Sequence, residues 1–254
     1  MANEVLTEVR GRTLLITLNR PEAMNAINQA LAEQLAAALD RLDTDDSLSV
    51  GVLTGNGRGF SAGMDLKAFL SDGMPMIGDR GFGGITAKSS DKPLIAAIEG
   101  FALAGGLELA MSCDILVAAN NAKFGVPETG VGLFAAAGAL LRLPRALPYG
   151  LAMKMALTAK PIGAELAHQH GLVTDLTEPG GAVEAALALA DQIARNAPLG
   201  LKASKTLIRE MQGRTEDEFW ALNRQLIDEV FHSADAVEGP KAFAEKRAPN
   251  WQGK

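Results

Sequence analysis

Two glutamates stand where a carboxylate could move a proton. Glu108 ends the segment AGGLE (104–108), at which an expected strand gives way to a helix, and Glu128 ends GVPE (125–128), which we expect to be a loop. A positioned carboxylate is a common general acid or base. Taken singly, each has a plainer interpretation, because Glu108 could complement a helix dipole and Glu128 could be a solvated loop residue.

The adjacent glycines of AGGLE indicate what could lie beside Glu108. Gly105 and Gly106 would let the backbone approach a ligand closely. The start of a helix offers unpaired N–H groups and positive dipole character. The segment therefore suits an oxygen that gains negative charge during a reaction.

A serine nucleophile is a second chemistry to consider. GFSAG (59–63) matches the G-x-S-x-G pattern of serine hydrolases, in which the serine follows a strand directly. Here the expected strand ends near Thr54, a glycine-rich loop intervenes, and no HGGG-like segment precedes it. We expect Ser61 not to be a nucleophile. Gly63 would instead permit a tight turn that aims the N–H of Met64 at a ligand.

The histidines and the cysteine indicate neither a triad nor a metal site. His168 and His170 are two positions apart in a helical stretch, so they face different sides of a helix, and His232 lies near a helix end. None follows an evident triad acid. The single cysteine, Cys113, lies in an apolar run, which is typical of a buried small residue. We expect no metal and no internal disulfide, which fits a reducing compartment.

Composition excludes further classes. The net charge is −6 and no basic cluster stands out, so nucleic-acid binding has no electrostatic basis. Gly55, Gly57 and Gly59 lack the spacing of a dinucleotide fingerprint. The N-terminal residues resemble neither a signal nor a transit peptide, and no run of about 18 apolar residues occurs. We expect a soluble, cytoplasmic protein without a membrane span.

The elements that would position these residues alternate between strand and helix over the first half of the chain, which is typical of an α/β core. Asn28 is the expected N-cap of a helix over 29–42, with Leu31, Leu35, Leu39 and Leu42 at helical spacing. One or two helical turns over 65–70 and a helix over 107–112 are also expected. Strands are expected over 13–18, 50–54, 93–98 and 115–119, with a short one in 123–128.

The rest of the chain divides into a loop and a helical region. Residues 71–90 are rich in Gly, Ser and charge, which favours a mobile loop with at most a short helix. From about 135 onward nearly every segment has helical periodicity. A change of character near 195–200 suggests a core domain over 1–195 and a helical region over 196–254. The expected helices are 135–142, 148–157, 163–169, 182–195, 199–212, 215–232 and 235–246.

An ordered series of segments over essentially the whole chain resembles the crotonase (enoyl-CoA hydratase/isomerase) family. The segments are NRPEAMNAIN (19–28), GRGFSAGMDLK (57–67), KPLIAAIEGFALAGGLELAMSCDILVAANNAKFGVPE (92–128), LRLPR (141–145) and FAEKR (243–247). The resemblance implies an α/β spiral of ββα units with a C-terminal helical region that mediates trimerisation. It also implies a homotrimer or a dimer of trimers (a hexamer), an acyl-CoA thioester as substrate, and a place in fatty acid metabolism such as β-oxidation.

The resemblance also assigns roles to residues. Glu108 would activate the water that attacks C3, Glu128 would protonate C2, and the backbone N–H groups of Met64 and Gly105 would form the oxyanion hole. Lys67 would lie near the CoA phosphates or adenine. The remaining contacts to substrate and CoA would come from Ala23, Asn25, Ala26, Ala62, Gly63, Asp65, Leu66, Gly106 and Pro127, and from Phe243 and Lys246, the last two reaching CoA in a neighbouring subunit.

The implied reaction is hydration of a trans-2-enoyl-CoA, in which water adds across the C2–C3 double bond. CoA enters as part of the substrate, so no separate cofactor is implied. Both glutamates favour hydration, dehydration or a related proton shuttle, and their closeness should raise one of the two pKa values. SAGMDLK and GFGGIT also resemble the carnitinyl-CoA dehydratase branch. The alternatives are an isomerase or such a dehydratase of the same fold, or a non-catalytic acyl-CoA-binding protein.

Two departures from the family pattern bear on the site. Ala104 stands first where the family has three glycines. Leu133, Phe134 and Ala135 to Ala137 replace a proline and a glycine pair in a stretch that should border the acyl pocket, so the preferred acyl chain stays open.

Overall fold

Six strands form the central sheet of the computed structural model, which describes residues 3–254. The strand order is β1-β2-β3-β6-β8-β11; β1 is antiparallel to β2, and the other neighbouring pairs are parallel. The sheet confirms the expected strands, but β1 and β11 were not predicted from the sequence. The bounds are β1 (Val5–Arg10), β2 (Thr13–Leu18), β3 (Val50–Gly55), β6 (Leu94–Ile98), β8 (Ile115–Ala119) and β11 (Asp175–Thr177).

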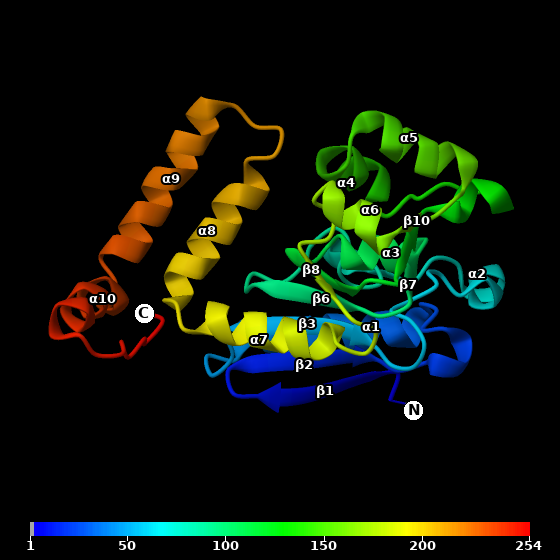
Figure 1. Ribbon diagram of the computed structural model, residues 1–254. Coiled ribbons are helices and arrows are strands. Elements are labelled where there is room, and N and C mark those ends of the chain that lie inside the picture. The colour runs from blue at the N-terminus through cyan, green and yellow to red at the C-terminus, as the bar shows by residue number, and fades with distance from the viewer. Residues whose placement is uncertain (1–2) are drawn as a thin grey trace.

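Alternation along the strands divides the buried side chains between two hydrophobic clusters. In β2, Leu14 and Ile16 belong to the larger cluster, while Leu15 belongs to the smaller one on the opposite face. Helix α7 (Ala182–Ala194) covers that opposite face, as Figure 1 shows. Its buried positions include Ala182, Ala186 and Ala190, whose small side chains on one side of the helix let it lie close to the sheet.

A second, smaller sheet turns the chain into a spiral. Strands β7 (Phe101–Leu103), β9 (Lys123–Gly125) and β10 (Ile162–Gly163) lie in the order β10-β9-β7. The chain thus passes from β6 to β7 and then into helix α3 (Gly105–Ala110), and from β8 to β9 in the same manner. An isolated bridge joins Ser61 to Ala102 and extends this pattern to the loop that follows β3. The predicted α/β spiral of ββα units is confirmed.

The helices of the core follow the sequence periodicity with one exception. Asn28 caps α1 (Gln29–Thr44) as expected, because its side chain accepts a hydrogen bond from Leu31 N at 2.9 Å. The prediction of a helix over 135–142 is wrong in position: Ala135 to Ala137 are not helical, and α4 (Ala139–Ala146) begins after Gly138, whose φ is 109°. Then follow α5 (Tyr149–Thr158) and α6 (Ala164–Gln169).

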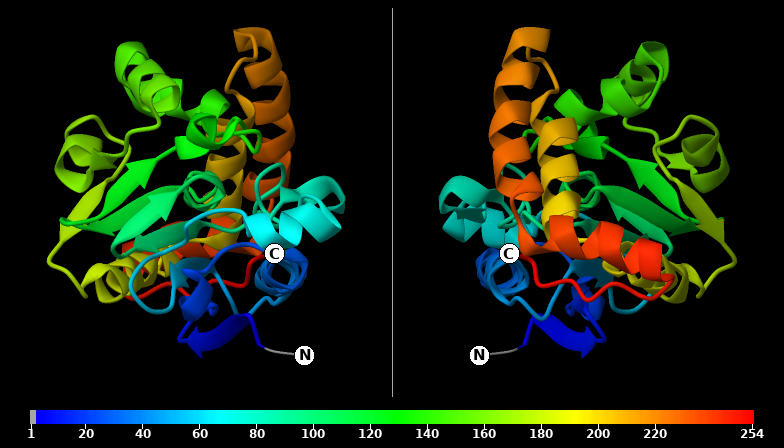
Figure 2. Two further views of the ribbon diagram at one scale, coloured as in Figure 1. Left: turned by 90° about the vertical axis from the view of Figure 1, so that its right-hand side faces the viewer. Right: turned by 90° about the vertical axis from the view of Figure 1, so that its left-hand side faces the viewer.

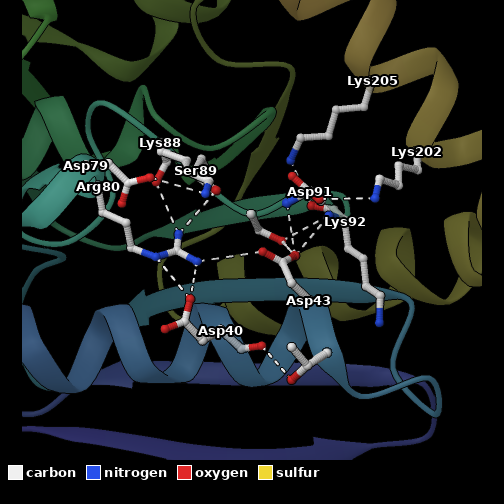
Figure 3. Close-up of polar contacts among 12 residues, drawn as sticks. Asp40, Asp43, Asp79, Arg80, Lys88, Ser89, Asp91, Lys92, Lys202 and Lys205 are labelled. Atoms are coloured by element: carbon white, nitrogen blue, oxygen red, sulfur yellow. Dashed lines mark hydrogen bonds and ion pairs between the residues drawn. The ribbon is translucent and has the colours of Figure 1, made fainter.

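Residues 71–90 differ from the expected mobile loop. Helix α2 (Leu66–Asp72) is followed by a two-stranded hairpin, β4 (Met76–Ile77) and β5 (Gly81–Phe82), with a 3-10 turn over Gly78–Arg80. Residues 80–86 are buried. The guanidinium of Arg80 explains this packing, because it pairs with Asp40 of α1 and donates to the carbonyls of Lys88 and Ser89 (Figure 3).

Three helices form the C-terminal region. Helices α8 (Pro198–Glu210) and α9 (Glu216–Phe231) run side by side (Figure 2), and Figure 1 shows them to one side of the rest of the protein, with α10 (Ala234–Glu245) turning away from them. Lys205 ties α8 to the core through Asp114 at 2.7 Å, and Lys202 pairs with Asp91 at 3.1 Å.

Candidate active site

Glu108 is buried, and its carboxylate is held by backbone amides. Its side chain lies in the short helix α3 and is part of a residue that is only 3 % exposed. Oε1 accepts hydrogen bonds from Ala137 N at 2.7 Å and from Ala139 N at 3.0 Å. Glu108 does lie in the first turn of a helix, as the plainer interpretation has it, but its side chain is buried and bound by two amides from outside that helix. The non-helical course of residues 135–138 has a physical reason here, because these amides are turned toward the carboxylate.

Two backbone N–H groups lie close together beside α3. An ideal Cβ placed on Gly63 would lie 2.9 Å from Gly105 N, and one placed on Gly105 would lie 3.5 Å from Met64 N. Over residues 3–254, neither the Met64 N–H nor the Gly105 N–H donates to a protein acceptor. Gly63 has φ of 101°, a conformation that favours glycine and makes the turn before Met64. The pair is arranged as two unpaired donors around one space, which is what stabilisation of an oxyanion requires.

Two small residues bring the start of α3 to this place. Ala104 has φ of 51° and ψ of −133°, a conformation that a residue with a Cβ adopts at a cost of about 1–3 kcal/mol. A Cβ on Gly106 would lie 2.3 Å from the carbonyl oxygen of Ser61, so only glycine fits there. The departure from the three glycines of the family pattern therefore falls at a residue with positive φ.

Glu128 differs from Glu108 in its surroundings. It follows Pro127 at the start of a 3-10 helix (Pro127–Val131), is half-buried, and its Oε2 is buried without a hydrogen-bond partner among the described residues. Burial raises the pKa of Glu128 to about 7, and the negative charge of Glu108 adds to the rise. The structure thus brings the two carboxyl groups close enough to interact. This agrees with the expectation that one pKa would be raised, although burial contributes more than the neighbouring charge.

The pKa of Glu108 responds to opposing influences. Burial, the largest influence, raises the pKa of Glu108, while the N–H groups of Ala139 and Ala137 and the charge of Arg142 limit the rise. Burial also raises the pKa of Glu128, which lacks a comparable set of donors. The two carboxyl groups therefore differ in how strongly their surroundings support the ionised form.

A cavity of about 510 Å³ lies next to the amides that hold Glu108. Its wall combines Met74, Met76 and Phe82 from the segment after α2 with Ala136 and Ala137. The stretch 133–137, which the family pattern places beside the acyl pocket, and the segment 71–90 therefore contribute to one largely apolar cavity. A larger cleft of about 710 Å³ lies between α8 and the core. Neither lining includes Glu108, Glu128 or a candidate N–H group, but the smaller cavity is lined by Ala137, which donates to Glu108.

The segments expected to contact CoA lie beside each other at the start of α2. A bridge pairs Ile27 with Met64, which brings residues 23–27, including Ala23 and Ala26, against residues 62–66, including Ala62. Leu66 and Lys67 are exposed there.

The side chains of Asn25 and Asp65, which belong to that set, form their polar contacts within the protein. Asn25 is 1 % exposed and donates to the carbonyls of Asn56 and Gly59. Asp65 caps α2 by accepting from the N–H groups of Lys67 and Ala68, and it also pairs with Arg20 at 3.0 Å. Their side chains therefore support this surface from within and present no free polar group to a ligand.

Phe243 and Lys246 are not brought to this site within one chain. Phe243 is 86 % exposed on α10, and Lys246 is the C-cap of the same helix. Figure 1 shows α10 at the opposite end of the molecule from α2. Their expected contact with CoA stays a prediction about a neighbouring subunit.

The geometry excludes Ser61 as a nucleophile. Ser61 is fully buried, and its Oγ donates to the carbonyl of Asn25 at 2.8 Å and accepts from Gly63 N at 3.1 Å. His168, a histidine that a serine hydrolase could use as its base, contacts the carbonyl of Val173 through Nδ1 and forms no hydrogen bond with Ser61. Ser61 stabilises the turn that precedes Met64.

Sequence reasoning missed the residues that hold Glu108. The amides of Ala137 and Ala139 carry no side-chain signal, and Arg142 of LRLPR had no assigned role. Arg142 donates to the carbonyls of Thr86 at 2.6 Å and Ala137 at 3.3 Å. The sequence feature that pointed to Arg142 was its position in the LRLPR motif.

Residues 3–254 contain neither a metal-binding cluster nor a helix that could span a membrane. No group of three or more His, Cys, Asp or Glu residues in this range is arranged to hold a metal ion. No helix in the same range has the length and apolar character needed to cross a membrane.

Comparisons with known proteins find similar chains over essentially the whole length. The family model for enoyl-CoA hydratase/isomerase matches residues 8–254. A 2,3-dehydroadipyl-CoA hydratase of Escherichia coli is 41 % identical over 99 % of this chain and 100 % of its own length. A carnitinyl-CoA dehydratase of Proteus mirabilis is 38 % identical, with 100 % of both chains covered. The crystal structure of an enoyl-CoA hydratase from Mycobacterium tuberculosis superposes with a TM-score of 0.96, at 50 % identity and 100 % coverage of both chains.

Proposed function

Because the chain belongs to the enoyl-CoA hydratase/isomerase family, we propose that it adds water across the C2–C3 double bond of a trans-2-enoyl-CoA thioester. The observation that carries this proposal is the pair of carboxyl groups in unlike surroundings, Glu108 with two amide donors and Glu128 with an unpaired buried oxygen. Hydration needs one group that activates water and one that delivers a proton.

The thioester oxygen would accept hydrogen bonds from the N–H groups of Met64 and Gly105. Attack at C3 moves electron density from the double bond onto that oxygen. Two donors fixed by the backbone stabilise the charge without rearranging, and losing one such donor in comparable sites raises the barrier by about 3 kcal/mol. The absence of any other acceptor for these two N–H groups among residues 3–254 supports this role.

The two glutamates would divide the proton transfers. Ionised Glu108, oriented by Ala137 and Ala139, would take a proton from water as the water attacks C3. Glu128, with a pKa of about 7, would hold a proton near neutral pH and deliver it to C2. The water loses one proton and C2 gains one, so the reaction is balanced without a further cofactor.

The substrate would enter along the start of α2. The CoA portion would lie across residues 23–27 and 62–67, with Lys67 toward its phosphates or adenine, and the acyl chain would extend into the cavity of about 510 Å³. Met74, Met76 and Phe82 make that cavity suited to an apolar chain.

The test is hydration of a panel of enoyl-CoA thioesters, followed as loss of the conjugated-enone absorbance. Glu108→Gln and Glu128→Gln should each lower kcat by about a hundredfold or more, because each removes a proton-transferring group. Glu99→Gln is a matched control: its carboxylate also accepts two backbone N–H groups, those of Gly180 and Ala182, but touches neither candidate amide. Near-normal turnover in both site variants would remove the proposed roles.

The same machinery could run in the direction of dehydration. The similarity to a carnitinyl-CoA dehydratase supports this second candidate. Analysis of products from 3-hydroxyacyl-CoA, carnitinyl-CoA and 3-enoyl-CoA substrates would separate dehydration and isomerisation from hydration. Acyl-CoA binding without turnover on any of them would indicate a non-catalytic protein.

A further inference from the structure

Arg142 connects two parts of the site that are far apart in sequence. It lies on α4, and its guanidinium donates through Nη2 to the carbonyl of Thr86 at 2.6 Å and through Nη1 to the carbonyl of Ala137 at 3.3 Å. Thr86 and Ala137 both line the cavity of about 510 Å³, as does Arg142 itself. One guanidinium therefore binds both stretches of the cavity wall, the one that contains Thr86 and the one that contains Ala137.

Ala137 contacts both Arg142 and Glu108. Ala137 N donates to Glu108 Oε1 at 2.7 Å, while the carbonyl of Ala137 receives Arg142. A shift of residues 137–139 would change the hydrogen bonds to the carboxylate and the shape of the cavity together. The planar guanidinium, with several donors in fixed directions, is suited to bridging two carbonyls in this manner.

We propose that Arg142 is a positioning residue that clamps residues 137–139 and Thr86 around Glu108 and supplies a positive charge beside its carboxylate. The inference rests on the proposed function of Glu108 as the base. It adds a residue that acts through Glu108 and the cavity wall, without contact with substrate.

The charges around this clamp come from four elements. Glu108 of α3 is faced by Glu128 of the 3-10 helix and by Arg142 of α4. Arg142 is faced in turn by Arg145 of its own helix, by Arg209 of α8 and by the Cys113 thiol. Burial and the charge of Arg209 lower the pKa of Arg142.

Arg145 provides a matched control. It belongs to the same cluster of positive charges, but it donates to Gln212 Oε1 at 2.6 Å instead of to the cavity wall. Arg145→Gln removes a positive charge from the cluster and leaves the contacts to Thr86 and Ala137 in place. Arg142→Gln removes both the charge and the bridge, and Arg142→Lys keeps the charge but loses the planar pair of donors.

The first measurement is the titration of Glu108 without substrate. In protein labelled with ¹³C at the glutamate carboxyl, the Glu108 signal is assigned by its loss in Glu108→Gln. Arg142→Gln should raise the titration midpoint of Glu108 by about one pH unit, because an opposite charge and an ordered donor are lost. Arg145→Gln should leave the midpoint unchanged. No shift in Arg142→Gln, or the same shift in Arg145→Gln, would overturn the proposal.

The second measurement is steady-state hydration of the enoyl-CoA panel. Arg142→Gln and Arg142→Lys should each lower kcat about tenfold or more, with a smaller change in KM for short chains. Arg142→Gln should also move the acidic limb of the pH profile upward, and Arg142→Lys should not. Wild-type kcat in Arg142→Lys would overturn the clamp even where Arg142→Gln does not fold. If the wild-type protein hydrates no enoyl-CoA, the proposed function fails, and the titration still decides the role of Arg142.

Discussion

Glu108 and Glu128 carry the same functional group, and their surroundings give it different properties. Two amides and a guanidinium favour the ionised form of Glu108. Glu128 has one carboxylate oxygen with no partner among the described residues, and burial favours its neutral form. The difference arises from tertiary contacts of each side chain and would not exist in a short peptide.

A pH profile tests this difference. In the proposed hydration Glu128 acts as an acid, so kcat/KM should fall as the pH rises through about 7, where Glu128 loses its proton. At lower pH, activity should fall when Glu108 becomes protonated. The measurement is kcat/KM for crotonyl-CoA across the range in which the protein stays folded.

The alkaline limb can be assigned by substitution. Glu128→Gln carries no titratable carboxyl, so its residual activity should show no decline near pH 7, whereas Glu99→Gln should keep the wild-type profile. A wild-type profile that is flat from about pH 6 to about pH 9 would contradict the proposed state of Glu128.

At the scale of the elements, the wall of the cavity of about 510 Å³ depends on a buried arginine. Arg80 is 8 % exposed, pairs with Asp40, lies 3.8 Å from Asp43, and donates to the carbonyls of Lys88 and Ser89 (Figure 3). These contacts fix a segment rich in glycine and charge against α1. The hairpin whose residue Phe82 lines the cavity is thus anchored to α1 by Arg80.

Removing this anchor should destabilise the fold. Arg80→Met leaves the carbonyl oxygens of Lys88 and Ser89 without the donor they have in Arg80 and removes the positive charge beside Asp40 and Asp43, so we expect a loss of about 2–3 kcal/mol in the free energy of unfolding. Lys88→Met is the control, because the exposed pair of Lys88 with Asp79 at 3.3 Å should contribute less than about 1 kcal/mol. Denaturant unfolding measures both, and equal losses in the two variants would show that Arg80 is not an anchor.

At the scale of the whole molecule, the C-terminal helices expose apolar side chains that a lone chain would leave in water. Ile208 is 73 % exposed, Phe231 71 %, Val237 70 % and Phe243 86 %. Exposed apolar surface of this kind is typical of an association interface. The ion pairs of Lys202 and Lys205 with the core hold α8 in a defined position from which it could meet a second copy.

We therefore predict self-association, as a trimer or a dimer of trimers. Sedimentation equilibrium should give three or six times the mass of one chain. Phe231→Asp should shift the distribution toward smaller species, because a charge would be buried in the interface. Val9→Asp, on strand β1 outside the helical region, should not do so, and a wild-type protein that stays monomeric at all concentrations would contradict the prediction.

The sequence by itself determined the elements whose signals are local. Leucines at helical spacing and the Asn28 cap define α1, and short, mostly apolar runs define the predicted strands of the central sheet. The family motifs located Glu108 and Glu128. These features follow from neighbouring residues, so an inspection of short segments is sufficient to find them.

Only the tertiary structure decided what depends on distant partners. Strand β1 is defined by its pairing with β2, and the hairpin before residue 90 by the contact of Arg80 with Asp40. Residues 135–137 have helical periodicity, but the amide of Ala137 is bound to Glu108, far away in sequence. A backbone amide has no side-chain signature, and its partner is chosen by packing. The fold brings these amides and Arg142 to Glu108 and leaves Glu128 without such partners. The difference between the two carboxyl groups, on which their proposed roles rest, therefore depends on the tertiary structure.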